Sequence, residues 1–206
     1  MPLNIAEFEQ GVAHFRSRPN WDSDFHNAFY KRMAVANPRG NFDDAWWQTF
    51  LHVLNQWQAT RGCAGEAFLT PRARRRFAAL SQTWKHTVKP NLAGDISTVM
   101  WSSVSAFPKL VAEIKDVESP VFTAKFCHFL APRIFPLEDN GAMGLPYETY
   151  RDCFLGYQRE WKTTTAQGAR EELVSRLARL IGSAPAMGYP FKNKVVELCL
   201  IGRHQG

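Results

Sequence analysis

The sequence has almost no signal for β-structure. No window keeps a sustained alternation of apolar and polar residues, and no Asn-Gly or Asp-Gly hairpin turn joins two such windows. Internal repeats and low-complexity segments are also missing. These absences argue against all-β and repeat architectures. They predict an all-α fold, with about eight to ten helices if the helices have typical lengths.

Long apolar runs and common reactive motifs are missing too. No window approaches the run of roughly 18 apolar residues that crosses a bilayer, and the N-terminus lacks a signal-peptide pattern. The motifs HExxH, CxxC, Walker Gly-Lys-Ser/Thr, GxSxG and GxGxxG are all absent. We therefore predict a cytoplasmic protein with no metal, no cofactor and no membrane partner.

Cysteine is scarce, with four residues at positions 63, 127, 153 and 199. None of them forms a closely spaced pair, and three lie in apolar helical patterns. This usage predicts reduced, buried thiols in a cytosolic protein. The spacing also excludes a cysteine-ligated iron–sulfur cluster.

Aromatic and basic residues are plentiful. Of 206 residues, 45% are hydrophobic and 13% aromatic, including 7 Trp and 15 Phe. This composition supports a well-packed core over residues 1–206, which we expect to form one compact monomeric unit, with a division into two lobes left open. The formal net charge of +6 is compatible with a polyanionic partner.

Apolar residues at helical spacing predict the helices. They cover 41–58, 70–88, 96–104, 109–114, 120–130, 147–161, 171–181 and 192–203. Residues 1–40 mix short helical signals with Pro19, Pro38 and Gly40, so we expect this part to wrap around the body.

The segment 119–140 is the most informative part of the chain. Ser119 is a good helix N-cap, and Pro120 suits the first helical position. Apolar residues then cover most of the circumference up to position 130, which predicts a central, buried helix. Two prolines prevent its continuation. Asp139 follows where a new helix should begin.

Two helices, 109–114 and 120–130, are predicted to form a helical hairpin. The hairpin, the short segment Ile134–Leu137 and then Asp139 follow the order found in the helix-hairpin-helix DNA glycosylases, which this part of the chain resembles. Thr123–Leu130 resembles the second hairpin helix of the 8-oxoguanine-glycosylase-like branch. The resemblance covers roughly residues 105–160. It implies that the hairpin 109–130 grips double-stranded DNA and that residues 131–160 hold the catalytic loop and helix, with Asp139 as the catalytic carboxylate.

The hairpin departs from the family pattern at two points. Its turn reads Asp116-Val117-Glu118, where the family carries Gly-x-Gly, and none of Ser119–Phe122 is the lysine of bifunctional members. Lys125 lies one turn later. The chain therefore resembles a monofunctional glycosylase acting in base excision. Its substrate would be a damaged base or a hypermodified base of phage DNA, the latter as antiviral defence.

The chemistry of base excision suggests further site residues. A fixed carboxylate stabilises positive charge on the sugar, and a flipped base enters a pocket lined by rings and hydrogen-bonding groups. Candidates for that pocket are Trp46, Trp47, Trp101, His128 and Tyr147. Candidates for DNA binding are Arg72, Arg75, Arg76, Lys115, Ser119 and Lys125. The arginines stand at the expected start of helix 70–88, where the helix dipole disfavours positive charge unless an anion is bound.

Other interpretations stay open. Asp139 could serve only as a helix cap, in which case Glu138, expected to face solvent, is the next candidate carboxylate. His128 has the pattern of a core histidine whose hydrogen bonds are satisfied. The whole chain could be a DNA-binding protein without catalytic activity, or a metal-independent hydrolase that uses Asp139 and His128 on another substrate.

Overall fold

The computed structural model describes every residue except 1, 37–39, 62–65, 116–118, 145–146 and 165–166. The described residues form helices and contain no strand, which confirms the all-α prediction. The α-helices are α1 (Ile5–Ser17), α2 (Asn27–Ala36), α3 (Asp44–Gln56), α4 (Glu66–Arg74), α5 (Phe77–Thr83), α6 (Trp101–Val104), α7 (Ala106–Ala112), α8 (Pro120–Leu130), α9 (Asn140–Met143), α10 (Tyr150–Thr163), α11 (Gln167–Ile181) and α12 (Phe191–Gln205). Among the described helices, none is long and apolar enough to span a membrane.

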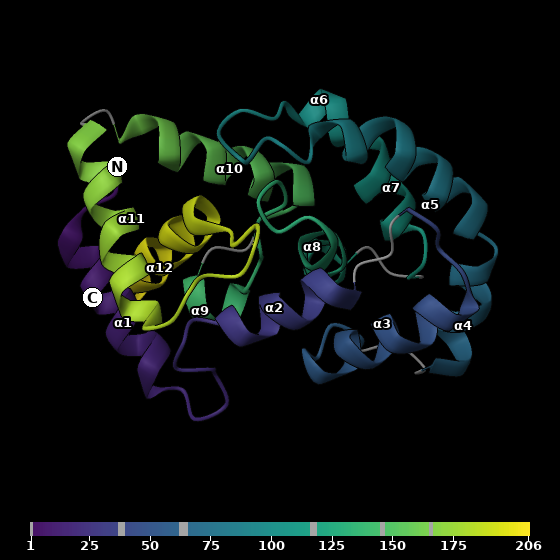
Figure 1. Cartoon of the computed structure of the whole chain (residues 1–206), viewed down its shortest axis with the longest axis horizontal. Helices are drawn as coiled ribbons and strands as arrows, with labels where there is room; N and C mark the ends of the chain where they lie inside the picture. Colours follow the sequence, from purple (N-terminus) through teal and green to yellow (C-terminus); the bar gives the residue numbers. More distant parts are fainter. Residues whose placement is uncertain (1, 37–39, 62–65, 116–118, 145–146, 165–166) are drawn as a thin grey trace.

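Helix α8 occupies the centre of the molecule (Figure 1). It begins as predicted, because Oγ of Ser119 accepts a hydrogen bond from the N–H of Phe122 at 3.3 Å and Pro120 takes the first helical position. Most of its side chains are buried, from Phe122 to Leu130 with Lys125 as the half-buried exception. Helices α1, α11 and α12 gather on one side of it, and α3, α4, α5 and α7 on the other (Figure 1).

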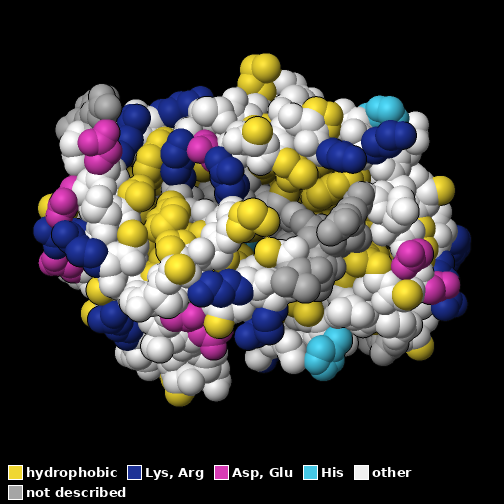
Figure 2. All heavy atoms as spheres, viewed as in Figure 1, with side chains coloured by type: hydrophobic (Ala, Val, Ile, Leu, Met, Phe, Trp, Pro, Cys, Tyr) yellow, Lys and Arg dark blue, Asp and Glu magenta, His cyan; other side chains and the backbone are white. Residues whose placement is uncertain are grey.

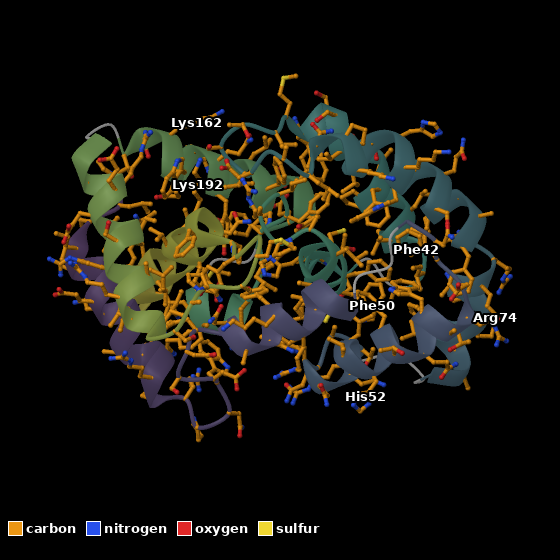
Figure 3. All side chains as sticks on the ribbon, viewed as in Figure 1. Phe42, Phe50, His52, Arg74, Lys162 and Lys192 are labelled. Atoms are coloured by element: carbon orange, nitrogen blue, oxygen red, sulfur yellow. The ribbon has the colours of Figure 1, made fainter. Side chains whose placement is uncertain are left out.

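The core on the α3 side is aromatic. The ring centroids of Phe126 and Phe50 are 4.9 Å apart, and Trp46 stacks on Phe50 at 4.8 Å. Trp47 is fully buried, and its indole N–H donates to Oγ1 of Thr70 at 2.9 Å. Phe42 and Phe50 point into the body in Figure 3. Edge-to-face and stacked rings of this kind stabilise a core beyond their area burial.

The N-terminal part belongs to the core and does not merely wrap around it. Helix α1 packs along α12, with Phe8 and Phe15 buried. The two backbones approach closely because both helices carry glycine at the contact. A Cβ atom added to Gly11 would lie 1.8 Å from the carbonyl oxygen of Leu198, and one added to Gly202 would lie 1.8 Å from that of Glu7. Only glycine fits such a crossing.

The single helix expected over 70–88 was wrong. Helix α4 begins earlier, ends at Arg74 and contains Pro71, and α5 and a π-helical turn, Trp84–Val88, follow it. Thr70 is therefore a buried partner of Trp47 and not a helix cap. Arg72 and Arg74 lie in the last turn of α4, where the helix dipole favours positive charge. The expected conflict with the dipole therefore does not arise for Arg72, whereas Arg76 stands at the N-cap of α5 and forms an ion pair with Glu113.

The helix expected over 96–104 is shorter than predicted. Only Trp101–Val104 is helical. Oδ1 of Asp95 accepts hydrogen bonds from the N–H and hydroxyl of Ser97, which form a turn, and the N–H of Ile96 donates to the carbonyl of Arg133 at 2.8 Å. An aspartate that bonds its own neighbouring backbone competes with helix formation.

The two hairpin helices are present as α7 and α8, and they pack against each other. Helix α7 begins at Ala106 and includes Pro108 in its first turn, where a proline is tolerated. The predicted turn Asp116-Val117-Glu118 lies outside the described residues.

Candidate functional site

A cavity of about 670 Å³ lies where segments far apart in the sequence meet. Its walls come from the α1–α2 loop, α2, the carboxyl end of α3, α8, the segment 137–142 and α12. Helices α2 and α3 run along the lower edge of the molecule in Figure 1. The charged groups lining the cavity are Arg18, Arg32, Arg61, Lys125, Asp22, Glu138, Asp139 and Glu197, and the rings are Trp21, His26, Phe29 and Trp57.

Asp139 is both a cap and a cavity residue. Its Oδ1 accepts a hydrogen bond from the N–H of Ala142 at 3.1 Å, and its backbone carbonyl accepts one from the N–H of Met143 at 2.9 Å. The side chain is half-buried and lines the cavity. The two interpretations of Asp139 are therefore not exclusive, since the cap bond fixes a carboxylate that still reaches the cavity.

Glu138 was expected to face solvent, and this was wrong. It is completely buried and lines the same cavity. The reason lies in the backbone of the preceding residues. The hydroxyl of Tyr150 donates to the carbonyl of Pro136 at 3.0 Å, and the thiol of Cys153 lies 3.8 Å from the carbonyl oxygen of Leu137. Anchored on α10 in this way, the segment enters the protein interior.

Lys125 lies in the cavity together with Asp139. Its Nζ donates to the carbonyl oxygen of Trp57 at 2.6 Å, which ties α8 to the end of α3. Burial lowers the pKa of Lys125, and the nearby Asp139 carboxylate partly opposes this shift. Of the residues predicted to bind DNA, Lys125 lines this cavity.

A buried ion pair borders the cavity. Nζ of Lys194 lies 2.7 Å from Oε2 of Glu197, and both side chains are buried. Burial raises the pKa of Glu197, Lys194 opposes the rise, and Asp139 adds to it. Burial also lowers the pKa of His26 well below its usual range, with Lys194 contributing. The imidazole of His26 is therefore neutral near pH 7.

The backbone is strained at this cavity. Among the described residues other than glycine, those with a left-handed conformation are Phe25 at φ 55°, His26 at φ 66° and Gln58 at φ 57°. His26 and Gln58 line the cavity, and Phe25 precedes His26. Such conformations cost on the order of 1–3 kcal/mol each and are concentrated at functional sites. This is an indication of function that does not depend on the charges.

The predicted base-pocket residues do not line this cavity. Trp46 and Trp47 pack in the aromatic core described above, and Trp101 packs on Phe154 with ring centroids 5.1 Å apart. Tyr147 packs near Gly156, whose added Cβ would lie 2.9 Å from the Tyr147 ring.

His128 is a core histidine whose two ring nitrogens are both bonded. Nδ1 donates to the carbonyl of Phe135 at 2.7 Å, so Nε2 accepts the hydroxyl hydrogen bond of Tyr30, also at 2.7 Å. Burial lowers the pKa of His128 to about 3. The ring is therefore neutral and held in place by both bonds.

The predicted DNA-binding arginines are bonded to neighbouring parts of the protein. Nε of Arg72 donates to the carbonyl of Ile114 at 2.9 Å, and Arg76 forms an ion pair with Glu113 at 2.7 Å. These bonds attach α4 and α5 to the end of α7. Arg75 donates to the carbonyl of Pro71 at 3.3 Å. Figure 3 shows Arg74, next to them, at the outer edge of the molecule.

The hairpin residues of the predicted set have structural partners too. Nζ of Lys115 donates to the carbonyl of Arg61 at 2.9 Å, and Ser119 caps α8. These bonds do not prevent contact with DNA, but each gives the residue a role within the fold.

The sequence analysis missed several cavity residues: Arg18, Trp21, His26, Arg32, Trp57, Arg61 and Glu197. One signal was available. Lys194 and Glu197 are charged residues inside the long apolar run of α12, and buried charges of this kind are normally paired. The others come from separate segments whose meeting no local pattern predicts.

Comparison with known proteins gives no match: no family, no curated protein and no solved structure was found to resemble this chain. In the part of the chain that the structure describes, no group of three or more His, Cys, Asp or Glu side chains is arranged to hold a metal ion.

Proposed function

We propose that this chain is a monofunctional DNA glycosylase in which Asp139 is the catalytic carboxylate. The observation that carries the proposal is the position of Asp139. It follows the buried hairpin helix, a hydrogen bond from Ala142 holds it, and it lines a cavity with aromatic walls. The order of hairpin, short loop and aspartate is the one that the sequence shares with helix-hairpin-helix glycosylases.

The cavity suits a flipped nucleotide. Its volume of about 670 Å³ lies within the range of about 300–1,000 Å³ that is usual for small-molecule sites. Trp21, Phe29 and Trp57 offer ring faces and edges for a base that has left the stack. The volume leaves room for a base that carries a substituent, which is compatible with a damaged or a hypermodified base.

The reaction assigned to Asp139 is hydrolysis of the bond between C1′ of the sugar and the base nitrogen. As this bond breaks, its electron pair leaves with the base, and the sugar gains positive charge that the carboxylate stabilises. A water oxygen then bonds to C1′. Asp139 accepts the proton that water loses and then releases it to solvent, while the departing base takes up a proton from solvent, so that one water is consumed and the atoms balance.

The amine of Lys125 is bonded to a backbone carbonyl and lies near Asp139. In our proposal it has no covalent role. A hydrolytic glycosylase leaves an abasic site that breaks only on alkaline treatment, whereas a Schiff-base enzyme breaks the strand itself. The test is therefore incubation with duplexes that contain damaged or phage-type modified bases, with and without alkali. We expect strand breaks in the duplexes that were incubated with the protein and then treated with alkali, and none without the alkali step.

The absence of breaks across such a panel would favour the second interpretation, a DNA-binding protein without catalytic activity. In such a protein the predicted basic patch would bind DNA less strongly, because Glu113 neutralises the charge of Arg76 and the carbonyl of Ile114 occupies a donor of Arg72. The third interpretation, a hydrolase using Asp139 with His128, has little support from the geometry. Both ring nitrogens of His128 are bonded, and the residue does not line the cavity.

A further inference from the structure

Three exposed arginines stand at the opening of the cavity. Arg18 follows α1, Arg32 lies on α2, and Arg61 follows α3, and all three line the cavity. The one exposed carboxylate in the same lining is Asp22. We call the three arginines the cavity rim. The sequence places them in separate segments, and folding brings them to one opening.

Two of the rim guanidinium groups have no bonding partner in the part of the fold that the structure describes. Arg32 and Arg61 make no side-chain hydrogen bond or ion pair with any residue that the structure describes. The guanidinium of Arg18 lies over the ring of Trp21, 5.8 Å from its centroid, and donates to His14 at 3.2 Å. Elsewhere the fold uses its arginines, as in the ion pairs Arg76–Glu113, Arg176–Glu9 and Arg203–Glu7.

Charge is layered from the opening of the cavity inward. The rim is exposed and mainly positive, Asp139 and Lys125 are half-buried, and Glu138 and Glu197 are buried. A ligand that matches this order has negative groups outside and a part that gains positive charge inside. A nucleotide within a strand has both, because its phosphates stay at the surface while its sugar and base enter the cavity.

Figure 2 shows that Lys and Arg side chains are spread over the face in view and lie beside acidic groups, with no single large basic patch. This face therefore does not form a general surface for a polyanion. A local site is sufficient to bind phosphate, because guanidinium groups bind phosphate through paired N–H donors.

We infer that the cavity rim, Arg18, Arg32 and Arg61, binds the phosphates of a nucleic-acid strand on either side of the nucleotide that enters the cavity. This inference deepens the proposed function and rests on it for the identity of the ligand. It replaces Arg72, Arg75 and Arg76 as the main phosphate contacts. The paired arginines would have to give up bonds within the fold, whereas Arg32 and Arg61 give up none that the described residues show.

The experiment measures binding of fluorescein-labelled duplex DNA by anisotropy over a range of salt concentrations. Each phosphate contact contributes about 0.9 to the slope of log K against log salt. Replacing Arg32 and Arg61 by alanine should therefore lower the slope by about two units and weaken binding. Their replacement by lysine keeps the charge, so most of the slope should remain.

Arg151 and Arg159 provide the matched control. Both are exposed arginines on α10 that do not line the cavity, so the variant R151A/R159A removes the same charge from another place. Thermal unfolding of all variants checks that they are folded. A slope unchanged in R32A/R61A, or lowered equally in R151A/R159A, would overturn the inference. So would equally tight binding of a free mononucleotide, which would assign the rim to a small phosphorylated ligand.

The two proposals fail separately. The slope is measured on intact DNA without any base release, so a glycosylase assay with no product leaves the rim result valid. Conversely, R32A/R61A could still release the base at saturating protein and show an unchanged salt slope. That result would support the proposed function and contradict phosphate binding by the cavity rim.

Discussion

Oδ1 of Asp139 and the backbone N–H of Ala142 are 3.1 Å apart, and this bond holds a carboxylate that also lines the cavity. Asparagine keeps an oxygen that can accept the bond but loses the charge. We expect D139N to bind DNA and to unfold like the wild type, while its rate of base release falls by about 10²–10³, the usual cost of removing one electrostatic stabiliser. Single-turnover assays with alkali cleavage measure the rate.

Alanine at the same position separates the cap from the chemistry. D139A loses both the charge and the capping oxygen, so it should lose base release and also about 0.5–2 kcal/mol in free energy of unfolding. If D139N keeps its activity, Asp139 is only a cap, and the buried Glu138 in the same cavity becomes the next carboxylate to test.

His128 should make the protein less stable in acid. Its pKa is near 6.5 in an unfolded chain and about 3 in the fold, so between these values only the unfolded state binds the proton. This contribution is complete above pH 6.5 and is lost as the pH falls toward 3, at about 1.4 kcal/mol per pH unit. His26, whose pKa is also lowered, adds in the same direction.

Urea unfolding of the wild type and H128Q at pH 7, 6 and 5 tests this. We expect H128Q to be less stable at pH 7, because the hydroxyl of Tyr30 and the carbonyl of Phe135 lose their partner. The gap between the two proteins should narrow by about 2 kcal/mol from pH 7 to pH 5. A gap that stays constant would show that His128 is not the titrating group.

Local pattern was enough to predict the centre of the fold. The cap Ser119, Pro120 and the apolar residues after them correctly bounded α8, because the cap, the proline and the burial all act within one helix. Asp139 at the start of the next helix was predictable for the same reason.

The cavity was not predictable, because it depends on contacts between distant segments. Glu138 reads as a surface residue until Tyr150 anchors the loop before it, and Trp57 reads as the end of an apolar stripe until Lys125 bonds its carbonyl. The DNA-binding role predicted for the arginines at 72–76 is a different case and stays a prediction. Their density in sequence suggested a ligand, but the carbonyl of Ile114 and the carboxylate of Glu113 satisfy two of them.

The buried pair Lys194–Glu197 should be costly to break at one side only. E197Q leaves the ammonium of Lys194 buried without its counter-ion, for which the typical loss is about 3–5 kcal/mol in free energy of unfolding. Replacing both, as K194M/E197L, removes the unpaired charge and should cost clearly less than E197Q. The pair between the half-buried Arg176 and the exposed Glu9 is the control, and E9Q should cost less than about 1 kcal/mol. A double variant as unstable as E197Q would show that shape, and not charge, is what the pair contributes.

The crossing of α1 and α12 gives the sharpest test of the fold around the cavity, since Arg18 follows α1 and Glu197 lies on α12. In G11A or G202A the new methyl group would meet a backbone carbonyl at 1.8 Å, and a backbone cannot turn aside as a flexible side chain can. The helices must separate, so each variant should lose at least the 1–3 kcal/mol that is typical of overpacking.

Gly168 on α11 is the matched control, because a Cβ added there meets nothing within 4 Å. G168A should be neutral or gain up to about 1 kcal/mol, because alanine favours the helix more than glycine does. Urea unfolding of the three variants measures the difference. If G11A and G202A behave like G168A, the helices do not cross at glycine contact distance, and the position of Glu197 relative to the cavity rim would have to be revised.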